Sequence, residues 1–392
     1  MSPSLPLVTT AERRHRLGRR HRLAPSARAA SVSEAADAVV ALRATDAAAL
    51  FLSARARLAE GGPATVEQAL YEDVSVVRLL SMRNTLFVVS AELAPYVDSS
   101  TARSIAAKER RTFLKHLQED DQGLDADWLA RTEAAALVAR DAHGPCTGSQ
   151  LSAAVPALRE KITVGQGKKY ETETGVATRV IRLLLAADGR IRRDRPRGSW
   201  TSSQFRWVHT ESWTAVPPAE ARAEIARRWL HAYGPATEAD LKWWTGWTLT
   251  AVRKALTAVG PAQVRLDDGG TALVGPGDTA PEPAPEPWAA LLPGLDPSGM
   301  GWADRGFHLD PAHRLALFDY AGNIGPTVWW NGEIVGGWAQ RADGEIVWRL
   351  LGDPGRAAET GIAAEVARLA PWVGGTRITP RFRTPLEREL VA

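Results

Sequence analysis

The sequence predicts an α+β fold in which three winged helix-turn-helix modules precede an antiparallel sheet or small barrel. The tetrad Gly-Pro-x-Thr occurs three times, at residues 62–65, 144–147 and 234–237. Two strand-like runs separated by a turn follow the second and third copies. After a Pro-rich segment, short apolar runs divided by Gly-Asn, Asn-Gly and Asp-Gly turns replace the helical patterning, which indicates antiparallel strands.

The chain has 392 residues, of which 45% are hydrophobic and 24% are charged, and it is long enough for two to four compact units. The boundaries that we expect are 1–125, 126–215, 216–276 and 277–392. No run approaches the roughly 18 to 20 apolar residues that span a bilayer, and the basic N-terminus is not followed by an apolar export segment. We therefore expect a cytoplasmic protein without a membrane partner. We also expect it to be a monomer and to be associated with the nucleoid.

Metal and cofactor chemistry have no support in the sequence. Cys146 is the single cysteine, so an internal disulfide, a thiolate zinc site and an iron–sulfur cluster are excluded. Histidines with HExxH spacing, a phosphate loop and a dinucleotide fingerprint are also missing. We expect no cofactor and no metal.

The tetrads predict sharp turns into newly capped helices. Gly ends the preceding helix, Pro prevents its continuation, and Thr accepts from backbone N–H groups of the next helix. Three residues after each Thr stands a side chain suited to a capping box, Gln68, Gln150 or Asp240. Each tetrad therefore predicts the opening half of a helix-turn-helix.

The remaining elements of each module follow from apolar spacing and turn residues. In the first module they are helices near 35–42, 46–58, 66–70 and 74–80 and a strand at 85–89. In the second they are a helix at 176–187 and strands at 190–193 and 200–208. In the third they are helices at 241–244 and 249–259 and a hairpin at 263–266 and 271–274.

The C-terminal region begins after a Pro-rich acidic segment, 276–287, which we expect to be an extended linker. The strand-like runs that follow are 315–319, 327–330, 334–339 and 346–351, and a helix is expected over 356–370. Their alternation predicts an antiparallel sheet or small barrel.

Basic residues are concentrated in two segments of a chain whose net charge is only +3. Residues 13–28 carry seven Arg and no acidic residue, and residues 190–206 carry six Arg and one Asp. Two basic patches favour a polyanion held on one face of the protein. The alternative is an ordinary solvated basic surface.

The second basic segment supplies most of the candidate DNA-binding residues. We expect Arg192, Arg193, Arg195 and Arg197 to meet successive phosphates, with Ser202 and Gln204 as neutral donors. Trp200, beside the basic turn, is the tryptophan that we expect at the DNA, whereas most of the 15 Trp suit a core. Lys168 and Lys169 extend the set from a nearby loop. The alternatives are a hairpin whose charge prevents edge aggregation and a solvated loop.

Several stretches carry a resemblance to a known family. They are residues 17–23 (LGRRHRL), 42–46 (LRATD), 54–57 (ARAR), 81–87 (SMRNTLF), 198–204 (GSWTSSQ), 301–305 (GWADR) and 336–340 (GGWAQ). The chain resembles the bacterial winged-helix proteins that include azinomycin-resistance and crosslink-unhooking DNA glycosylases. The resemblance implies three tandem winged helices scaffolded by a C-terminal antiparallel β-barrel, a concave surface for double-stranded DNA, and excision of bulky N7-alkylated purines.

The resemblance also indicates where the chemistry takes place. In that family, catalysis is attributed to a Gln-x-Gln or Gln-x-Asp triplet just before a helix near the N-terminus, and the matching positions here are Arg43, Ala44 and Thr45. Asp46, the next residue, polarises a water or caps the helix that follows. Thr45 bonds a water or the local backbone, and Arg43 suits a phosphate or an ion pair.

The function that we expect is a DNA glycosylase for repair or toxin resistance, with Arg43, Thr45 and Asp46 at its catalytic site. An N7-alkylated purine is already cationic and leaves without a general acid, so a group that orients a water suffices. The alternative is a non-catalytic winged-helix DNA-binding protein or regulator, because the triplet differs from the glutamine pattern.

Overall fold

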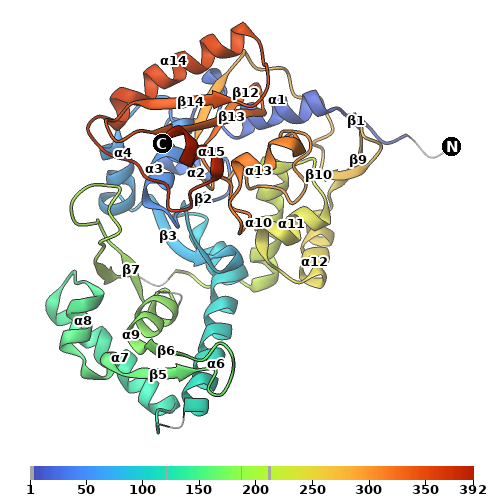
Figure 1. Ribbon diagram of the computed structural model, residues 1–392. Coiled ribbons are helices and arrows are strands. Elements are labelled where there is room, and N and C mark those ends of the chain that lie inside the picture. The colour runs from blue at the N-terminus through green and yellow to red at the C-terminus, as the bar shows by residue number, and fades with distance from the viewer. Residues whose placement is uncertain (1–3, 121, 187, 211–212) are drawn as a thin grey trace.

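The computed structural model describes residues 4–120, 122–186, 188–210 and 213–392. The chain forms a mixed α+β molecule with several small sheets (Figure 1). We divide it for description into a first unit (residues 4–120), a second (122–210), a third (213–276) and a C-terminal unit (277–392). None of the helices described has both the length and the apolar character that crossing a membrane requires.

The first unit combines short helices with a three-stranded antiparallel sheet of order β2-β4-β3. Its elements are β1 (Leu7–Val8), α1 (Thr10–Arg20), a 3-10 turn (Pro25–Ala27), α2 (Val32–Asp37), β2 (Leu42–Arg43), α3 (Ala47–Arg57), α4 (Pro63–Glu67) with a π-helical extension (Gln68–Glu72), β3 (Val76–Ser81), a 3-10 turn (Met82–Asn84), β4 (Thr85–Ser90), α5 (Ala94–Val97) with a π-helical extension (Asp98–Ala102), and α6 (Arg103–Asp120).

The predicted helix at 74–80 is wrong, because this segment contains strand β3. It pairs with β4 over its whole length, from Val76 opposite Ser90 to Ser81 opposite Thr85. The run VSVVRLL contains three valines, whose branched side chains favour a pleated, half-buried surface over a helix. Apolar spacing alone did not distinguish the two structures.

The second unit carries two hairpins. Its elements are α7 (Ala126–His143), α8 (Gly148–Ala154), a 3-10 turn (Pro156–Arg159), β5 (Lys161–Val164), β6 (Thr172–Gly175), α9 (Val176–Thr178) with a π-helical extension (Arg179–Leu185), β7 (Ile191–Arg193) and β8 (Trp207–His209). The predicted helix at 176–187 is helical to Leu185, and Ala187 lies outside the described residues. The predicted strand at 200–208 is strand only from Trp207. Before it, single backbone bonds from Asp194 to Arg206 and from Arg197 to Gln204 replace the regular ladder.

The third unit follows the prediction closely. It comprises α10 (Pro218–Tyr233), α11 (Glu238–Thr245), α12 (Leu249–Val259), β9 (Ala262–Leu266) and β10 (Thr271–Val274). The hairpin pairs Thr271 with Arg265 and Val274 with Ala262. β1 from the N-terminus adds a parallel third strand beside β9.

The three tetrads fold in two different ways. Thr147 and Thr237 cap α8 and α11 in capping boxes completed by Gln150 and Asp240, as predicted. Thr65 instead lies inside α4, which begins at Pro63 with Gly62 as its N-cap. In the second and third copies the residue before Thr bridges a hairpin strand, Cys146 to Trp207 and Ala236 to Leu273, and no such bridge holds the first.

The C-terminal unit contains an open four-stranded antiparallel sheet, so the predicted barrel is wrong. Its elements are β11 (Ala289–Leu292), a 3-10 turn (Pro311–His313), α13 (Arg314–Leu317), β12 (Thr327–Trp330), β13 (Glu333–Gln340), β14 (Ile346–Leu350), α14 (Arg356–Val373) and α15 (Pro385–Leu390). The strand order is β11-β12-β13-β14, and the segment predicted as a strand at 315–319 is mostly the turn of α13. Four strands are too few to close, and α3, α14 and α15 pack on the sheet instead.

Two large hydrophobic cores and two small clusters stabilise the molecule. One large core runs from Leu17 to Leu390 and joins the first, third and C-terminal units. The other combines Phe113 and Leu117 at the end of α6 with residues of the second unit as far as Trp207. In Figure 1 the second unit stands to one side, connected through α6 and through the β7–β8 hairpin. The outer end of this hairpin reaches back to the first core, where Trp200 is buried.

Candidate nucleic-acid interface and active site

The junction between β2 and α3 holds the three residues predicted to be catalytic. Arg43 ends β2, opposite Phe87 of β4, and the chain turns through Thr45 into α3. Asp46 is the N-cap of α3: its Oδ1 accepts from the backbone N–H of Ala48 at 2.9 Å and of Ala49 at 3.3 Å. The capping alternative for Asp46 is therefore confirmed.

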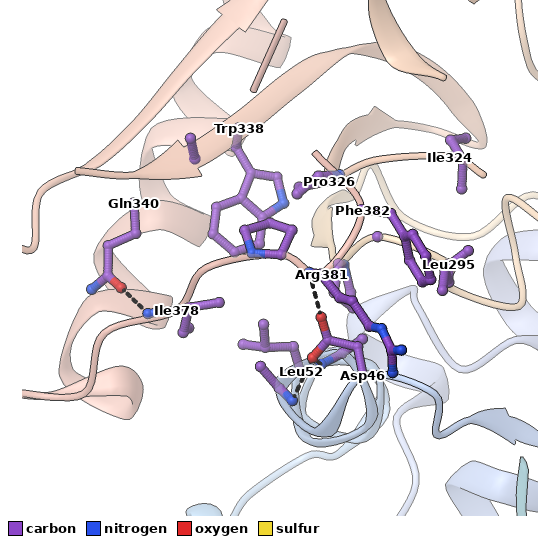
Figure 2. A pocket seen from close by; sticks show the side chains of 16 residues that line it. Asp46, Leu52, Leu295, Ile324, Pro326, Trp338, Gln340, Ile378, Arg381 and Phe382 are labelled. Atoms are coloured by element: carbon purple, nitrogen blue, oxygen red, sulfur yellow. Dashed lines mark hydrogen bonds between the residues drawn. The ribbon is translucent and has the colours of Figure 1, made fainter. Parts of the chain in front are cut away.

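The second carboxylate oxygen of Asp46 faces the segment between α14 and α15 (Figure 2). Asp46 Oδ2 accepts from the backbone N–H of Arg381 at 2.9 Å, and the Arg381 guanidinium donates to the carbonyl of Thr45 at 3.5 Å. A carboxylate offers about four acceptor positions, so one on Oδ2 stays free. Asp46 also lines a mostly apolar cavity of about 20 Å³, with room for one water, together with Leu52, Trp338 and Phe382.

Thr45 and Arg43 have polar atoms that the described residues leave unsatisfied. The Thr45 hydroxyl is enclosed, and neither it nor Arg43 Nε has a hydrogen-bond partner there. Arg43 is 9% exposed and lies 5.5 Å from the centroid of the Phe87 ring. Burial, followed by the charge of Arg83, lowers the pKa of Arg43 to about 10. Arg43 is thus a cation enclosed near a second cation.

Further arginines surround the same junction. Arg83, at the β3–β4 turn with φ of 56°, lies 4.3 Å above the ring of Trp243. Arg305 lies 4.9 Å from the same ring, and burial, followed by the charges of Arg314 and Arg83, lowers its pKa to about 10. One indole of the third unit therefore holds two guanidiniums from other units.

On the other side of the junction, Arg193 of β7 packs on Phe205 at 3.8 Å. Burial, followed by the charges of Arg78, Arg182 and Arg381, lowers its pKa to about 9. Because Arg381 also contacts Thr45, it connects this group to the β2–α3 junction.

We call the whole set the arginine row: Arg314, Arg305, Arg83, Arg43, Arg381, Arg193, Arg78 and Arg182. Every ion pair found among the described residues involves other side chains. Guanidiniums that are placed together and have no ion-pair partner there form a positive region of the kind that binds phosphates, although Asp240 and Asp304 lie near Arg305. The row draws its arginines from the first, second and C-terminal units.

The residues predicted from the β7–β8 hairpin have unequal environments. Arg192 is partly buried, and Arg195 pairs with Glu72 at 2.8 Å. Arg197 and Gln204 are exposed and line one groove of about 670 Å³ with Arg182. Ser202 is bonded locally, its hydroxyl accepting from the N–H of Gln204 at 3.1 Å.

Lys168 and Lys169 are exposed in the turn between β5 and β6. They come from a different hairpin than the arginines of β7–β8. The structure therefore brings Arg197 and Gln204 together at one groove and leaves the two lysines on a separate projection.

Trp200 is not a surface residue, contrary to the prediction. Its side chain is 7% exposed, stacks on Phe51 of α3 with ring centroids 5.1 Å apart, and meets Trp372 of α14 edge-on at 5.5 Å. A ring enclosed in this way anchors the hairpin to the first and C-terminal units and presents no face for a base.

The N-terminal basic segment is not a free cationic patch either, because the acidic linker at 276–287 lies against α1. Asp278 pairs with Arg16 at 3.1 Å and with Arg20 at 2.7 Å. Glu282 pairs with Arg20 at 2.9 Å and with Arg19 at 3.2 Å. The prediction of an extended linker is wrong for residues 276–280, which form a turn, and residues 281–287 have no helix or strand. The carboxylates of this segment neutralise much of the patch.

The sequence did not predict most of the arginine row, since Arg78, Arg83 and Arg305 are isolated basic residues and Arg381 lies outside the two basic segments. A signal existed for two of them. Arg83 and Arg305 stand within the stretches 81–87 and 301–305 that carry the family resemblance. No cluster of three or more metal-ligating side chains was found in the described part of the chain.

Comparisons with known proteins show the family of the chain. A family model described as DNA glycosylase AlkZ-like matches residues 36–372. The interstrand DNA cross-link repair glycosylase of Streptomyces sahachiroi is 30% identical over 179 residues, which are 43% of this chain and 48% of that protein. The sequence match thus spans about half the length of this relative.

The structure is also similar to a solved one, the DNA glycosylase AlkZ of Streptomyces sahachiroi. The TM-score is 0.70 at 21% identity, over 95% of this chain and 98% of that chain. At this identity the likeness supports the fold. The family model covers most of the chain, from α2 to α14, and on that match the chain belongs to the AlkZ-like DNA glycosylase family.

Proposed function

We propose that this protein is a DNA glycosylase that binds duplex DNA along the arginine row and releases a bulky alkylated purine from it. The observation that carries the proposal is the course of the row, which passes the β2–α3 junction where Thr45 and Asp46 lie. The name of the curated relative adds cross-linked DNA as a substrate class. A role in repair or in resistance to an alkylating toxin follows from this chemistry.

We also propose that the first three units are winged helix-turn-helix modules. In each unit, two helices precede a β-hairpin. The segment just before the first of these two helices pairs with the second strand of the hairpin. The pairs that support this reading are β2 with β4, Cys146 with Trp207, and Ala236 with Leu273. Such modules present a helix and a hairpin to DNA.

The chemistry that the junction supports is hydrolysis with a positioned water. Water attacks the sugar C1′ atom as the glycosidic bond breaks, and the electron pair of that bond neutralises the cationic base. We assign the free acceptor position on Asp46 Oδ2 and the Thr45 hydroxyl to the water, whose proton passes to Asp46. Arg43 stays protonated, so we assign it to a phosphate of the target strand.

The test is base release under single-turnover conditions, with the full chain in excess over a duplex containing one N7-alkylated guanine. We expect free adduct and an equal amount of abasic DNA, and neither product from the undamaged duplex. If the damaged duplex shifts in a gel but releases no base, the protein is the non-catalytic DNA-binding alternative instead.

A further inference from the structure

A small pocket between the first and second units is lined by four arginines. Arg78 belongs to β3 of the first unit, Arg182 to the π-helical extension of α9, and Arg192 and Arg193 to β7. The rest of the lining is apolar and includes Trp207, and no acidic residue takes part. The cavity holds about 20 Å³, enough for one oxygen atom of water size.

The free protein leaves this pocket electrostatically unsatisfied. The Nε atoms of Arg78 and Arg193 are enclosed, and neither has a hydrogen-bond partner in the described ranges. Like charges that are held together in a partly desolvated site repel each other, which raises the free energy of the folded protein. An anion bound between them compensates this repulsion. Arg193 is also fixed in place, because its guanidinium packs on Phe205 at 3.8 Å.

We infer that this pocket is a seat for one phosphodiester of the DNA backbone. One non-bridging oxygen enters the cavity, and the rest of the group lies at its mouth, accepting from Arg78 and Arg193. Guanidinium–phosphate contacts of this kind are charge-assisted and geometrically specific. The inference rests on the proposed function only in taking DNA as the source of the phosphate.

The seat has a mechanical consequence, because its walls belong to units with separate cores. β3 belongs to the larger core, whereas Trp207 and Ile191 belong to the core of the second unit. Without an anion, the facing guanidiniums of Arg78 and Arg193 push these walls apart. A bound phosphate attracts both, so DNA binding stabilises the contact between β3 and β7.

The first test is a salt titration of binding to an undamaged duplex. The variants are Arg78→Gln, Arg193→Gln and their double substitution, with Arg356→Gln, an exposed residue at the start of α14, as the matched control. Each single variant should reduce the slope of log K against log salt by about one. The double variant should also lose about one, not two, because both side chains hold the same phosphate.

The second test needs no DNA. The unfolding midpoint is measured in sodium phosphate and in sodium chloride at equal ionic strength. We expect phosphate to raise the midpoint of the wild type and of Arg356→Gln, and to raise the midpoint of Arg193→Gln by clearly less. In chloride, Arg193→Gln should be no less stable than the wild type, since a cation facing other cations has been removed, and this shows that the variant folds.

The inference is overturned if Arg78→Gln and Arg193→Gln match Arg356→Gln in both the salt slope and the phosphate response. Base release in the single-turnover assay is a separate readout. Release without these two responses refutes the seat and leaves the glycosylase proposal intact. Both responses without release refute the glycosylase proposal and support the seat.

Discussion

Trp200 stacks on Phe51 with ring centroids 5.1 Å apart, although the two residues belong to different units. Trp372 closes the other side, and its indole N–H donates to the carbonyl of Gly61 at 2.9 Å. The β7–β8 hairpin is therefore attached at two places. β7 packs in the second unit, and Trp200 packs in the larger core. This double attachment fixes Arg193 and Arg195 beside the first unit.

Trp200→Ala should lower the free energy of unfolding by up to roughly 3–5 kcal/mol, because a large buried side chain leaves a cavity. Chemical denaturation measures this loss. Tyr320→Ala, at a fully exposed ring, is the control and should change stability by less than about 0.5 kcal/mol. An unchanged stability combined with weaker DNA binding would mean that Trp200 stacks on bases after all.

Arg43→Gln should weaken DNA binding by roughly 1–3 kcal/mol without lowering the unfolding midpoint. A hydrogen bond from a charged donor to a phosphate contributes about this much to binding. The unfolding midpoint should not fall, because the substitution removes an enclosed cation that lies near the charge of Arg83. Binding isotherms and thermal unfolding of the same preparations measure both effects. A large drop in the midpoint would show that Arg43 is structural.

Asp46 has two separable roles, which Asp46→Asn and Asp46→Ala distinguish. Asn keeps a side-chain oxygen for Ala48 and Ala49 and is an effective N-cap, but its NH2 group cannot accept from the Arg381 N–H. Asp46→Asn should therefore keep the helix cap, lose about 1 kcal/mol of stability and lose base release. Asp46→Ala should lose the helix cap as well, at a further stability cost of about 1 kcal/mol. If Asp46→Asn releases base at the wild-type rate, the carboxylate takes no part in the chemistry.

Asp278→Asn should destabilise the protein, because Arg16 is 1% exposed and would keep only Glu12 as a nearby counter-charge. Breaking a buried ion pair from one side costs roughly 3–5 kcal/mol, and the partial exposure of Asp278 places the expected loss below that range. Denaturation at neutral pH measures it. Arg253→Gln, which removes an exposed pair with Glu238, is the control.

Stability should fall as the solution is acidified below pH 6.5, before most carboxylates titrate. Burial, followed by the charge of Arg57, lowers the pKa of His21 to about 3, and burial holds the pKa of His308 well below its ordinary value. Between about pH 3 and 6.5 the unfolded chain binds a proton at His21 and the native protein does not, and the lowered pKa of His308 acts in the same direction. Stability is therefore full above pH 6.5 and is lost as the pH falls.

His21 should contribute roughly 1 kcal/mol per pH unit in this window. Urea unfolding at pH 7.0 and 5.5 tests the slope, and His21→Gln should reduce it by about this amount. Gln preserves a hydrogen-bonding side chain beside Ser298, which lies 2.8 Å from the His21 ring. A slope that His21→Gln leaves unchanged would contradict the assignment.

The sequence by itself determined the helices and hairpins whose caps and turns are formed by neighbouring residues. The hairpin β9–β10 follows from the turn DDGG, and α8 and α11 follow from Thr147 and Thr237 with their capping partners. The Asp46 cap was also foreseen, because an aspartate before an apolar helical run satisfies the first N–H groups of the helix. Such signals need no partner from elsewhere in the chain.

Tertiary structure decided the charge of the site and the shape of the C-terminal sheet. The basic run at 13–28 was correctly seen, but the linker residues that neutralise it lie about 260 positions away, as for Arg16 and Asp278. The arginine row arises in the opposite way, from single arginines that become neighbours only on folding. The interaction between two charges depends on their distance in the folded protein. A count of charges along a segment omits carboxylates that come from elsewhere in the chain, so it does not show which arginines are left unpaired to bind DNA.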